Sequence, residues 1–222
     1  MDNNPKQHSC RRRWLIGIGV ACLVIVLGLG AASNYMLSYS LFPPMRHGHN
    51  LPWRLNNILS QSPQLRPWVD SLRRCHALRD TFITMPSGER HHATYIVAHR
   101  PTDRVAVLVH GYKDNGMGMM HIASIYSRLG YHLLLPDLHA HGRSQGQGVQ
   151  MGWNDRLDVM RWMEVANSRF GQGRDTRMVV HGVSMGAATT MNVSGEQLPA
   201  YVRCFVEDCG YTSVRDAFGY EL

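Results

Sequence analysis

The longest run of apolar residues lies near the N-terminus, where residues 14–32 read WLIGIGVACLVIVLGLGAA and carry no charge. At about 1.5 Å per residue, a helix of this length spans roughly 28 Å, close to the hydrocarbon thickness of a bilayer. We therefore expect an uncleaved transmembrane anchor. Two alternatives stay open: a signal segment cleaved near the small residues 30–32, and a buried core helix, against which the three arginines at 11–13 argue.

Basic residues flank this run on one side only. Arg11, Arg12 and Arg13 come directly before it, and the next basic residue is Arg46. Because positively charged flanks stay on the cytoplasmic side, we expect residues 1–13 to be cytoplasmic and the rest of a single-pass membrane protein to be extracytoplasmic. Cleavage of the segment would instead release a secreted protein.

The next stretch, residues 33–79, reads as a linker with helical pieces. Its second part, residues 52–79, is predicted to be helical in two pieces that Pro63 and Pro67 interrupt. The folded domain is then expected to cover residues 80–222.

From residue 80 onward, short apolar runs alternate with helical patterns. Pro-Ser-Gly at 86–88 separates two strand-like runs, which predicts a hairpin. The run RVAVLVH is typical of a strand buried on both faces. The predicted strands are 81–85, 92–98, 104–110, 131–136, 177–181 and 201–207, with helices at about 118–129 and 185–193 and one more helix before the fifth strand.

That additional helix is indicated by a single apolar face. Val159, Trp162, Met163, Ala166 and Phe170 fall at i, i+3, i+4, i+7 and i+11. A hairpin followed by alternating strands and helices predicts an α/β fold with a doubly wound, mainly parallel sheet. In such sheets the functional site lies beyond the carboxyl ends of the strands.

The formal charge of +7 is concentrated in the N-terminal half of the chain. Residues 101–222 carry eleven basic and twelve acidic residues, so the predicted domain is close to neutral. A nucleic-acid-binding domain concentrates basic charge on its folded surface. We therefore expect no nucleic-acid partner, and we assign the basic excess to the flank of the membrane segment or to a solvated surface.

The motif that carries chemistry is Gly182-Val183-Ser184-Met185-Gly186, which lies between a predicted strand and a predicted helix. In that context G-x-S-x-G is typical of a nucleophile elbow, a strained turn that lifts the serine hydroxyl above the sheet. Glycines fit where a Cβ would be too crowded. We predict Ser184 as a catalytic nucleophile, and the N-terminus of the following helix favours developing negative charge.

A second motif, His110-Gly111-Tyr112, follows the first long buried strand. A tetrahedral acyl intermediate needs two converging N–H donors for its oxyanion. We predict the backbone N–H groups of Tyr112 and Met185 in this role, with His110 and Gly111 forming the loop that presents the first of them.

The segments VLVHGYKDN, LLPDLHAHGRSQG, HGVSMGAAT and VEDCGYTS, in this order and spacing, resemble bacterial serine hydrolases of the α/β-hydrolase fold, in the YqkD/Bem46-like group. The resemblance covers about residues 80–222. It implies esterase-like chemistry on carboxylic-acid derivatives, with Ser184 as nucleophile and Tyr112 and Met185 as oxyanion hole. It also implies a structural role, and not that of the catalytic base, for the loop containing Asp137, His141, Gly142 and Ser144.

The catalytic base is missing from the expected position. In this fold the chain order is serine, then acid, then histidine, but the last histidine here is His181, before Ser184. Asp208 is a weak candidate for the acid. A capping box at Ser213-Val214-Arg215-Asp216 opens a helix with six residues left in the chain. We therefore expect a fragment of a longer hydrolase, inactive alone.

We expect no metal and no cofactor. His139 and His141 lie near His110 and His181 in the predicted strand-end rim, but no carboxylate or cysteine joins these four at a recognisable ligand spacing.

The leading hypothesis is a membrane-tethered serine hydrolase (esterase, lipase or thioesterase-like) that acts on a small-molecule or lipid ester, thioester or amide through an acyl-enzyme at Ser184. The alternative is a non-catalytic α/β-hydrolase-like binding module at the membrane, or the product of a degenerate gene. The sequence gives no indication of substrate identity or oligomeric state.

Overall fold

The computed structural model describes the backbone of residues 5–42 and 50–219 and the side chains of 13–42, 50–217 and 219. The chain divides into two compact units, one that ends at Pro43 and one that starts at Pro44. Each unit is described by itself.

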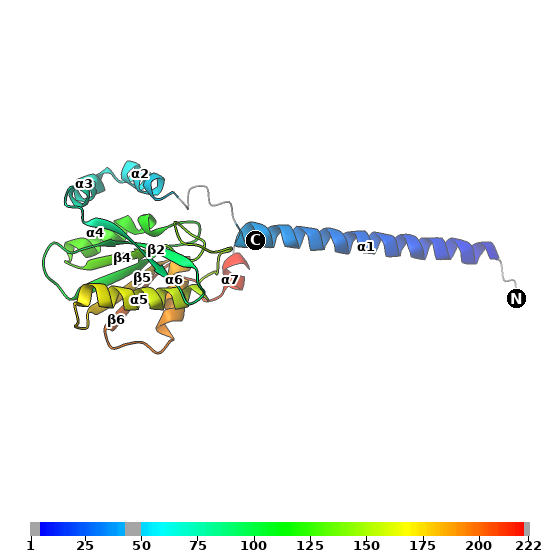
Figure 1. The fold of residues 1–222 in the computed structure, drawn as a ribbon. Coiled ribbons are helices and arrows are strands. Elements are labelled where there is room, and N and C mark those ends of the chain that lie inside the picture. The colour runs from blue at the N-terminus through cyan, green and yellow to red at the C-terminus, as the bar shows by residue number, and fades with distance from the viewer. Residues whose placement is uncertain (1–4, 43–49, 220–222) are drawn as a thin grey trace. The chain divides into compact units, whose positions relative to one another are not determined.

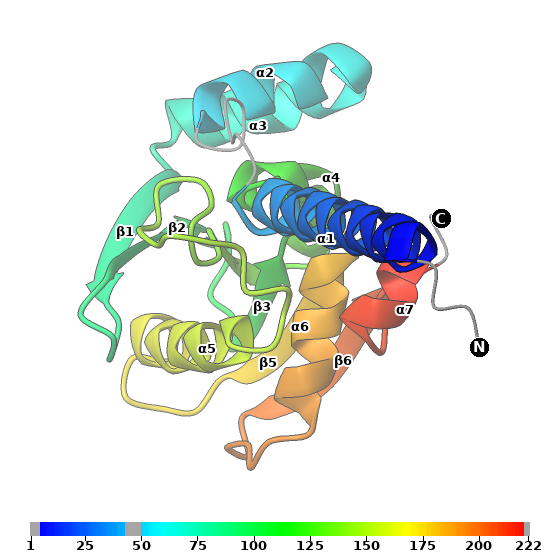
Figure 2. The same cartoon turned by 90° about the vertical axis from the view of Figure 1, so that its right-hand side faces the viewer.

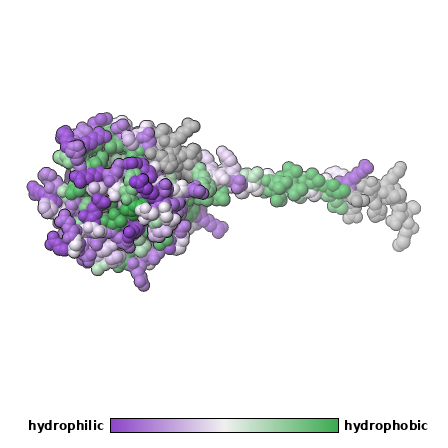
Figure 3. Space-filling model, in the orientation of Figure 1, coloured by the Kyte–Doolittle hydropathy of each residue, from purple (hydrophilic) through white to green (hydrophobic). Residues whose placement is uncertain are grey.

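The N-terminal unit is one long helix, α1 (Pro5–Leu41). Its stretch Arg13–Leu41 is long and apolar enough to cross a membrane by length and composition, a test that a signal sequence or a core helix also passes. The apolar side chains along this stretch are exposed, among them Trp14, Leu23 and Leu27 (Figure 3). The predicted membrane segment 14–32 lies inside this helix, which continues for nine further residues.

The C-terminal unit is built on a six-stranded sheet in the order β1-β2-β4-β3-β5-β6. Its strands are β1 (Leu78–Thr84), β2 (Arg90–Ile96), β3 (Arg104–Val109), β4 (His132–Pro136), β5 (Arg177–Val183) and β6 (Val202–Asp208). The hairpin β1–β2 is antiparallel, β2 pairs antiparallel with β4, and β4, β3, β5 and β6 run parallel. This confirms the predicted α/β fold with a doubly wound, mainly parallel sheet.

Helices cover both faces of the sheet, as Figures 1 and 2 show for α4 on one side and α5 on the other. The first face carries the short 3-10 helix η2 (Gly116–Met119) and α4 (Met120–Arg128). The second carries α5 (Asp155–Gly171) and α6 (Met185–Ser194). A last helix, α7 (Val214–Gly219), follows β6, and the Asp216 N–H donates to Ser213 Oγ at 3.0 Å, as the predicted cap requires.

The apolar face predicted for the helix before the fifth strand lies at the centre of one hydrophobic core. Val159, Trp162, Met163, Ala166 and Phe170 of α5 are all buried against β3, β4 and β5. Trp162 is among the largest fully buried side chains of the described residues.

The segment predicted as a linker differs from the expectation. Helix α2 (Leu51–Gln61), the 3-10 helix η1 (Pro63–Leu65) and α3 (Arg66–Arg74) do form helical pieces broken near the two prolines. They are nevertheless packed elements, because their apolar side chains are buried with those of β3 and β4 on the first face of the sheet. The folded unit therefore begins well before Asp80.

Polar contacts fasten this helical segment to the loops of the sheet. Arg54 donates two hydrogen bonds to the Asp114 carboxylate, at 2.6 and 2.5 Å, and thereby links α2 to the loop after β3. The Trp68 indole N–H donates to Ser127 Oγ of α4 at 3.1 Å. The apolar spacing along residues 51–72 was the signal that the sequence offered for this packing.

If α2 is part of the core, truncating its buried face must destabilise the fold. Ile58 is 2% exposed, so Ile58→Ala is expected to lower the free energy of unfolding by about 2–5 kcal/mol. Asn56 is an exposed position two residues before Ile58 in the same helix, and Asn56→Ala should change the free energy of unfolding by less than about 0.5 kcal/mol. Denaturant unfolding of the detergent-solubilised chain measures both; equal, small effects would contradict the packing.

Candidate active site

Ser184 occupies the turn between strand β5 and helix α6. Its φ of 56° and ψ of −118° are a strained conformation for a residue with a Cβ. Its N–H donates to the Asp208 carbonyl oxygen at 2.8 Å, while its side chain is exposed at the carboxyl edge of the sheet. The turn thus presents an accessible hydroxyl at the N-terminus of a helix.

The two glycines of the motif are required by close backbone approaches. A Cβ at Gly182 would lie 2.1 Å from the Gly186 carbonyl oxygen, and one at Gly186 would lie 2.1 Å from the Val109 carbonyl oxygen. Any side chain at either position would push α6 away from β5 and β3. The spacing of the two glycines around Ser184 is therefore what allows the helix to start immediately after the strand.

The loop after β3 lies directly beside Ser184. A Cβ on Gly111 would be 3.4 Å from Ser184 Cβ and 3.9 Å from Ser184 Oγ. Tyr112, Ser184 and Met185 line one cavity of about 200 Å³. The other residues that line this cavity are Met151, Tyr211, Val214 and Ala217. The predicted site residues of both motifs are thus brought together.

Met151 and Tyr211 join the cavity although the sequence analysis did not single them out. The Tyr211 hydroxyl donates to the Met151 carbonyl oxygen at 3.0 Å, a bond that closes one wall. Burial, and then the nearby Asp155 carboxylate, raise the pKa of Tyr211 to about 12, so this hydroxyl stays protonated. No motif marks either residue, because they meet only through the folding of two separate loops.

His110 braces the loop and does not act on substrate. Its Nε2 accepts the Leu138 N–H at 3.0 Å, which leaves Nδ1 to donate to the Gly111 carbonyl oxygen at 2.8 Å. The side chain is completely buried, and this burial lowers its pKa, so the ring is neutral. With both ring nitrogens engaged, His110 sets the position of Gly111 beside Ser184.

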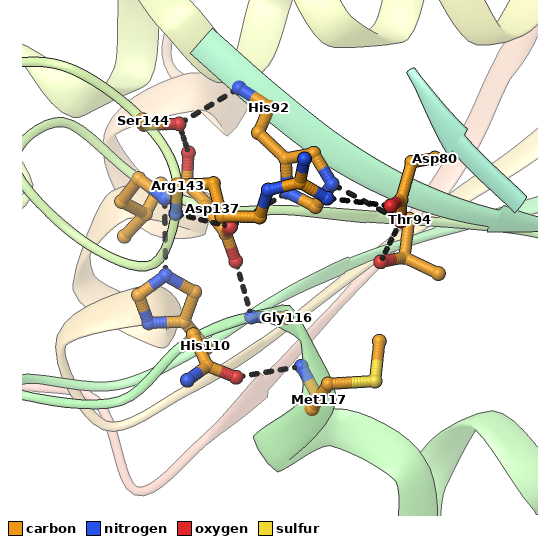
Figure 4. A network of polar contacts seen from close by, with 11 residues as sticks. Asp80, His92, Thr94, His110, Gly116, Met117, Asp137, Arg143 and Ser144 are labelled. Carbon is orange, nitrogen blue, oxygen red and sulfur yellow. Dashed lines mark hydrogen bonds and ion pairs between the residues drawn. The ribbon is translucent and has the colours of Figure 1, made fainter. Parts of the chain in front are cut away.

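The Asp137 carboxylate ties three elements together (Figure 4). Its Oδ1 accepts the Gly116 N–H at 2.8 Å, and its Oδ2 accepts the Arg143 N–H at 2.8 Å and lies 2.7 Å from His92 Nδ1. Asp137 is fully buried. Ser144 adds to the same network, since its hydroxyl donates to the Asp137 carbonyl oxygen and accepts the His92 N–H. These contacts are consistent with the structural role predicted for this loop.

The four rim histidines considered in the sequence do not converge on one point. His141 Nε2 accepts the Lys113 N–H at 3.3 Å, so this buried ring, like His110, holds the loop after β3. His181 contacts the Tyr126 hydroxyl on the other face of the sheet. His139 instead lies against His91 and Glu89, residues that the sequence analysis missed.

Asp208 supplies a backbone contact and not a catalytic dyad. Its carbonyl oxygen accepts the Ser184 N–H, and its carboxylate accepts a hydrogen bond from the Cys209 thiol at 3.2 Å. Among the residues that the structure describes, no histidine is hydrogen-bonded to Ser184 Oγ. The site as described holds the predicted nucleophile and oxyanion loop, and the roles of these residues remain predictions.

Comparisons with known proteins agree with this fold. A family model described as serine aminopeptidase, S33, matches residues 100–207. The uncharacterized protein YqkD of Bacillus subtilis is 23% identical over 128 residues, which is 58% of this chain and 41% of that protein. The chain therefore has the α/β-hydrolase fold and is similar to proteins of that family.

Solved structures show the same fold. An esterase from Pyrococcus furiosus superposes in one crystal form with a TM-score of 0.52 at 23% identity, over 60% of this chain and 50% of that chain. In a second crystal form the TM-score is 0.54 at 21% identity, over 65% of this chain and 60% of that chain. The chain thus spans about half the length of the relatives that it matches.

Removing the Asp137 carboxylate should destabilise the protein, because this carboxylate joins the loops at the carboxyl edge of the sheet. Asp137→Ala leaves the buried Gly116 N–H and the buried His92 ring without their acceptor, at about 1–3 kcal/mol each, and also removes the acceptor of the partly buried Arg143 N–H. We expect the free energy of unfolding to fall by at least about 3 kcal/mol.

Asp103 is the matched control, because it also accepts two hydrogen bonds, from Arg177, but is exposed. Asp103→Ala should cost less than about 1 kcal/mol. Both variants would be measured by denaturant unfolding. Similar decreases in the free energy of unfolding would contradict the central structural role of Asp137.

Proposed function

We propose that the protein is a membrane-anchored serine hydrolase that cleaves a carboxylic ester, thioester or amide through an acyl-enzyme at Ser184. One observation carries the proposal: an exposed serine in a strained strand-to-helix turn, beside a loop in which a Cβ on Gly111 would lie 3.4 Å from Ser184 Cβ. The match of residues 100–207 to a family model of serine aminopeptidases supports it.

In the first half of the reaction, Ser184 Oγ attacks the substrate carbonyl carbon while its proton passes to a general base. The carbonyl oxygen becomes an oxyanion that accepts hydrogen bonds from the N–H groups of Met185 and Tyr112. Met185 is the first residue of α6, where backbone N–H groups have no partner within the helix. The base returns its proton to the leaving group, and the acyl-enzyme remains.

In the second half, the base takes a proton from a water that attacks the acyl carbon, and Ser184 Oγ leaves with that proton. The chain order of the family places the acid and the histidine after the nucleophile. No histidine follows Ser184 in residues 185–222. We infer that these residues do not supply the general base, and that residues 1–222 without a base are nearly inactive.

The walls of the cavity favour an acyl group as the bound portion of the substrate. Met151, Val214 and Ala217 supply apolar surface next to Ser184, and Tyr211 is oriented by its bond to the Met151 backbone. A small molecule or a lipid acyl chain fits this chemistry.

Helix α1 is proposed as the anchor. None of the side chains in its apolar window is buried, and lipid would cover them in a bilayer. The arginines at 11–13 place residues 1–13 in the cytoplasm and the hydrolase unit on the opposite side. A cleaved signal segment is the alternative and would leave a secreted enzyme.

A second candidate function is a non-catalytic binding module at the membrane. The observation that favours it is the lack of any histidine bonded to Ser184 Oγ within the described part of the chain. This candidate predicts that the complete gene product has no esterase activity that depends on Ser184.

Ser184→Ala in the complete product of the natural gene is expected to reduce kcat for p-nitrophenyl ester hydrolysis by roughly 10⁴–10⁶-fold, because the acyl-enzyme cannot form. Ser194→Ala, at an exposed position at the other end of α6, should leave the rate unchanged. Retained activity in Ser184→Ala would assign the chemistry elsewhere, and the absence of any activity in the natural protein would favour the binding module.

Deletion of residues 14–32 is expected to move the protein from the membrane pellet to the soluble fraction. The intact protein should resist carbonate extraction, since the burial of about twenty apolar residues holds it in the bilayer. An N-terminal tag should be protected from protease added outside intact cells. Recovery of the mature protein without its first thirty residues would support the signal-segment alternative instead.

A further inference from the structure

Three side chains that could ligate a metal converge away from Ser184, at the end of the sheet where β2 begins. Glu89 lies in the β1–β2 turn, His91 in β2 and His139 in the loop after β4. Their ligand atoms all lie within 4.8 Å of one another. His139 is nearly fifty residues from Glu89 and His91 in the sequence, and the antiparallel pairing of β2 with β4 brings it to them.

The separations fit the coordination shell of a small cation. Glu89 Oε2 is 3.2 Å from His139 Nδ1 and 3.9 Å from a His91 nitrogen, Nε2. Metal–ligand distances of about 2.0–2.2 Å in a tetrahedral site imply roughly 3.4 Å between ligand atoms. The two Glu89 separations lie within about 0.5 Å of this value, and the separation between the two histidine nitrogens is no larger than 4.8 Å.

The His91 ring is buried and lacks partners. Its side chain is 1% exposed, and neither ring nitrogen makes a hydrogen bond within the described structure. Buried polar atoms are almost always satisfied. Burial lowers the pKa of His91 to about 4, so the ring is neutral and one nitrogen offers a lone pair. Nε2, the nitrogen aimed at Glu89, is the natural donor to an ion.

The other nitrogen of His91 faces a carboxylate. Nδ1 lies 3.4 Å from Asp158 Oδ2 of α5. Metal-bound histidines commonly donate their second N–H to such a carboxylate, which fixes the ring and its tautomer. The geometry therefore supplies a ligand set and the group that orients it.

The charges around the cluster also favour a cation. Two carboxyl groups border the cluster, because Glu89 Oε2 lies 3.2 Å from His139 Nδ1 and Asp158 Oδ2 lies 3.4 Å from His91 Nδ1. Within the described residues, neither Glu89 nor Asp158 forms an ion pair with a Lys or Arg. A divalent ion would compensate this surplus of negative charge.

We propose that Glu89, His91 and His139 bind a divalent transition-metal ion of the Zn²⁺ class, with Asp158 orienting His91. Two imidazoles and one carboxylate suit such an ion, whereas Mg²⁺ and Ca²⁺ prefer oxygen ligands alone. Glu89 is one-third exposed, which gives the ion an entry path and leaves a coordination position for water.

The ion has a structural role in this arrangement. It joins the hairpin to the loop after β4, and the His139 carbonyl oxygen accepts a hydrogen bond from His141 Nδ1 at 2.7 Å. His141 in turn accepts the Lys113 N–H of the loop beside Ser184. The bound ion would stiffen the scaffold of the rim without touching the reacting atoms, so the proposal stands or falls independently of the hydrolase activity.

Zinc binding by the full chain in detergent tests the proposal. After treatment with a chelator, equilibrium dialysis against ZnCl₂ with elemental analysis should give one tightly bound ion per chain. Glu89→Gln and His139→Gln, at partly exposed positions, should each weaken binding at least about tenfold, and Asp158→Asn by about 10–100-fold. His99→Gln, an exposed histidine outside the cluster, is the matched control and should bind as the wild type does.

Two further readouts guard against misfolded variants. Circular dichroism should show each variant folded, and zinc should raise the Tm of the wild type and of His99→Gln but not that of His139→Gln. Zinc binding of equal affinity in the wild type, Glu89→Gln and His139→Gln, or no tight binding in the wild type, would overturn the site.

Discussion

The Asp137 carboxylate is the contact on which the arrangement of the rim depends. It is fully buried, and it accepts N–H donors from the loop after β3 and from its own loop after β4, beside a ring nitrogen of β2. A Cβ at Gly142 would lie 2.1 Å from this carboxyl group, and Gly142 has a φ of +53°, so the loop can close around it only with glycine there. The loop after β3, which contains Tyr112 and lies beside Ser184, ends at the Gly116 N–H that this carboxylate accepts.

Two buried histidines extend the closure toward Ser184. His110 fastens Gly111 to the backbone of Leu138, and His141 holds the N–H of Lys113. Neutral rings suit this task, because one nitrogen donates while the other accepts. The loop that contains Tyr112 is therefore pinned on both sides, and preorganised donors are what an oxyanion hole requires.

The parts of the fold that could be predicted from the sequence are those with a local pattern of residues. The glycine spacing around Ser184 specified the elbow, and the period of Val159, Trp162 and Phe170 specified the buried face of α5. The packing of α2 and α3 was not predicted, because the prolines and polar residues of this segment are typical of a linker. Ile58 and Val69 are buried only through their contact with the apolar residues on one face of the sheet.

Contacts between distant segments were beyond the reach of spacing rules. Glu89, His91 and His139 come from a turn, a strand and a loop nearly fifty residues further on, so no ligand motif announces them. Met151 and Tyr211 reach the cavity in the same way. The bracing role of His110 was equally hidden, because only the fold reveals where its two nitrogens point.

The central claim is that Ser184 is a nucleophile activated by its setting, and a fluorophosphonate probe tests it most directly. The natural protein, captured from the membranes of cells that make it, would be treated with the probe and mapped by peptide mass spectrometry. The account predicts one covalent adduct, on Ser184, that is blocked by prior denaturation. A folded protein that forms no adduct, or one that is modified at another residue, would contradict it.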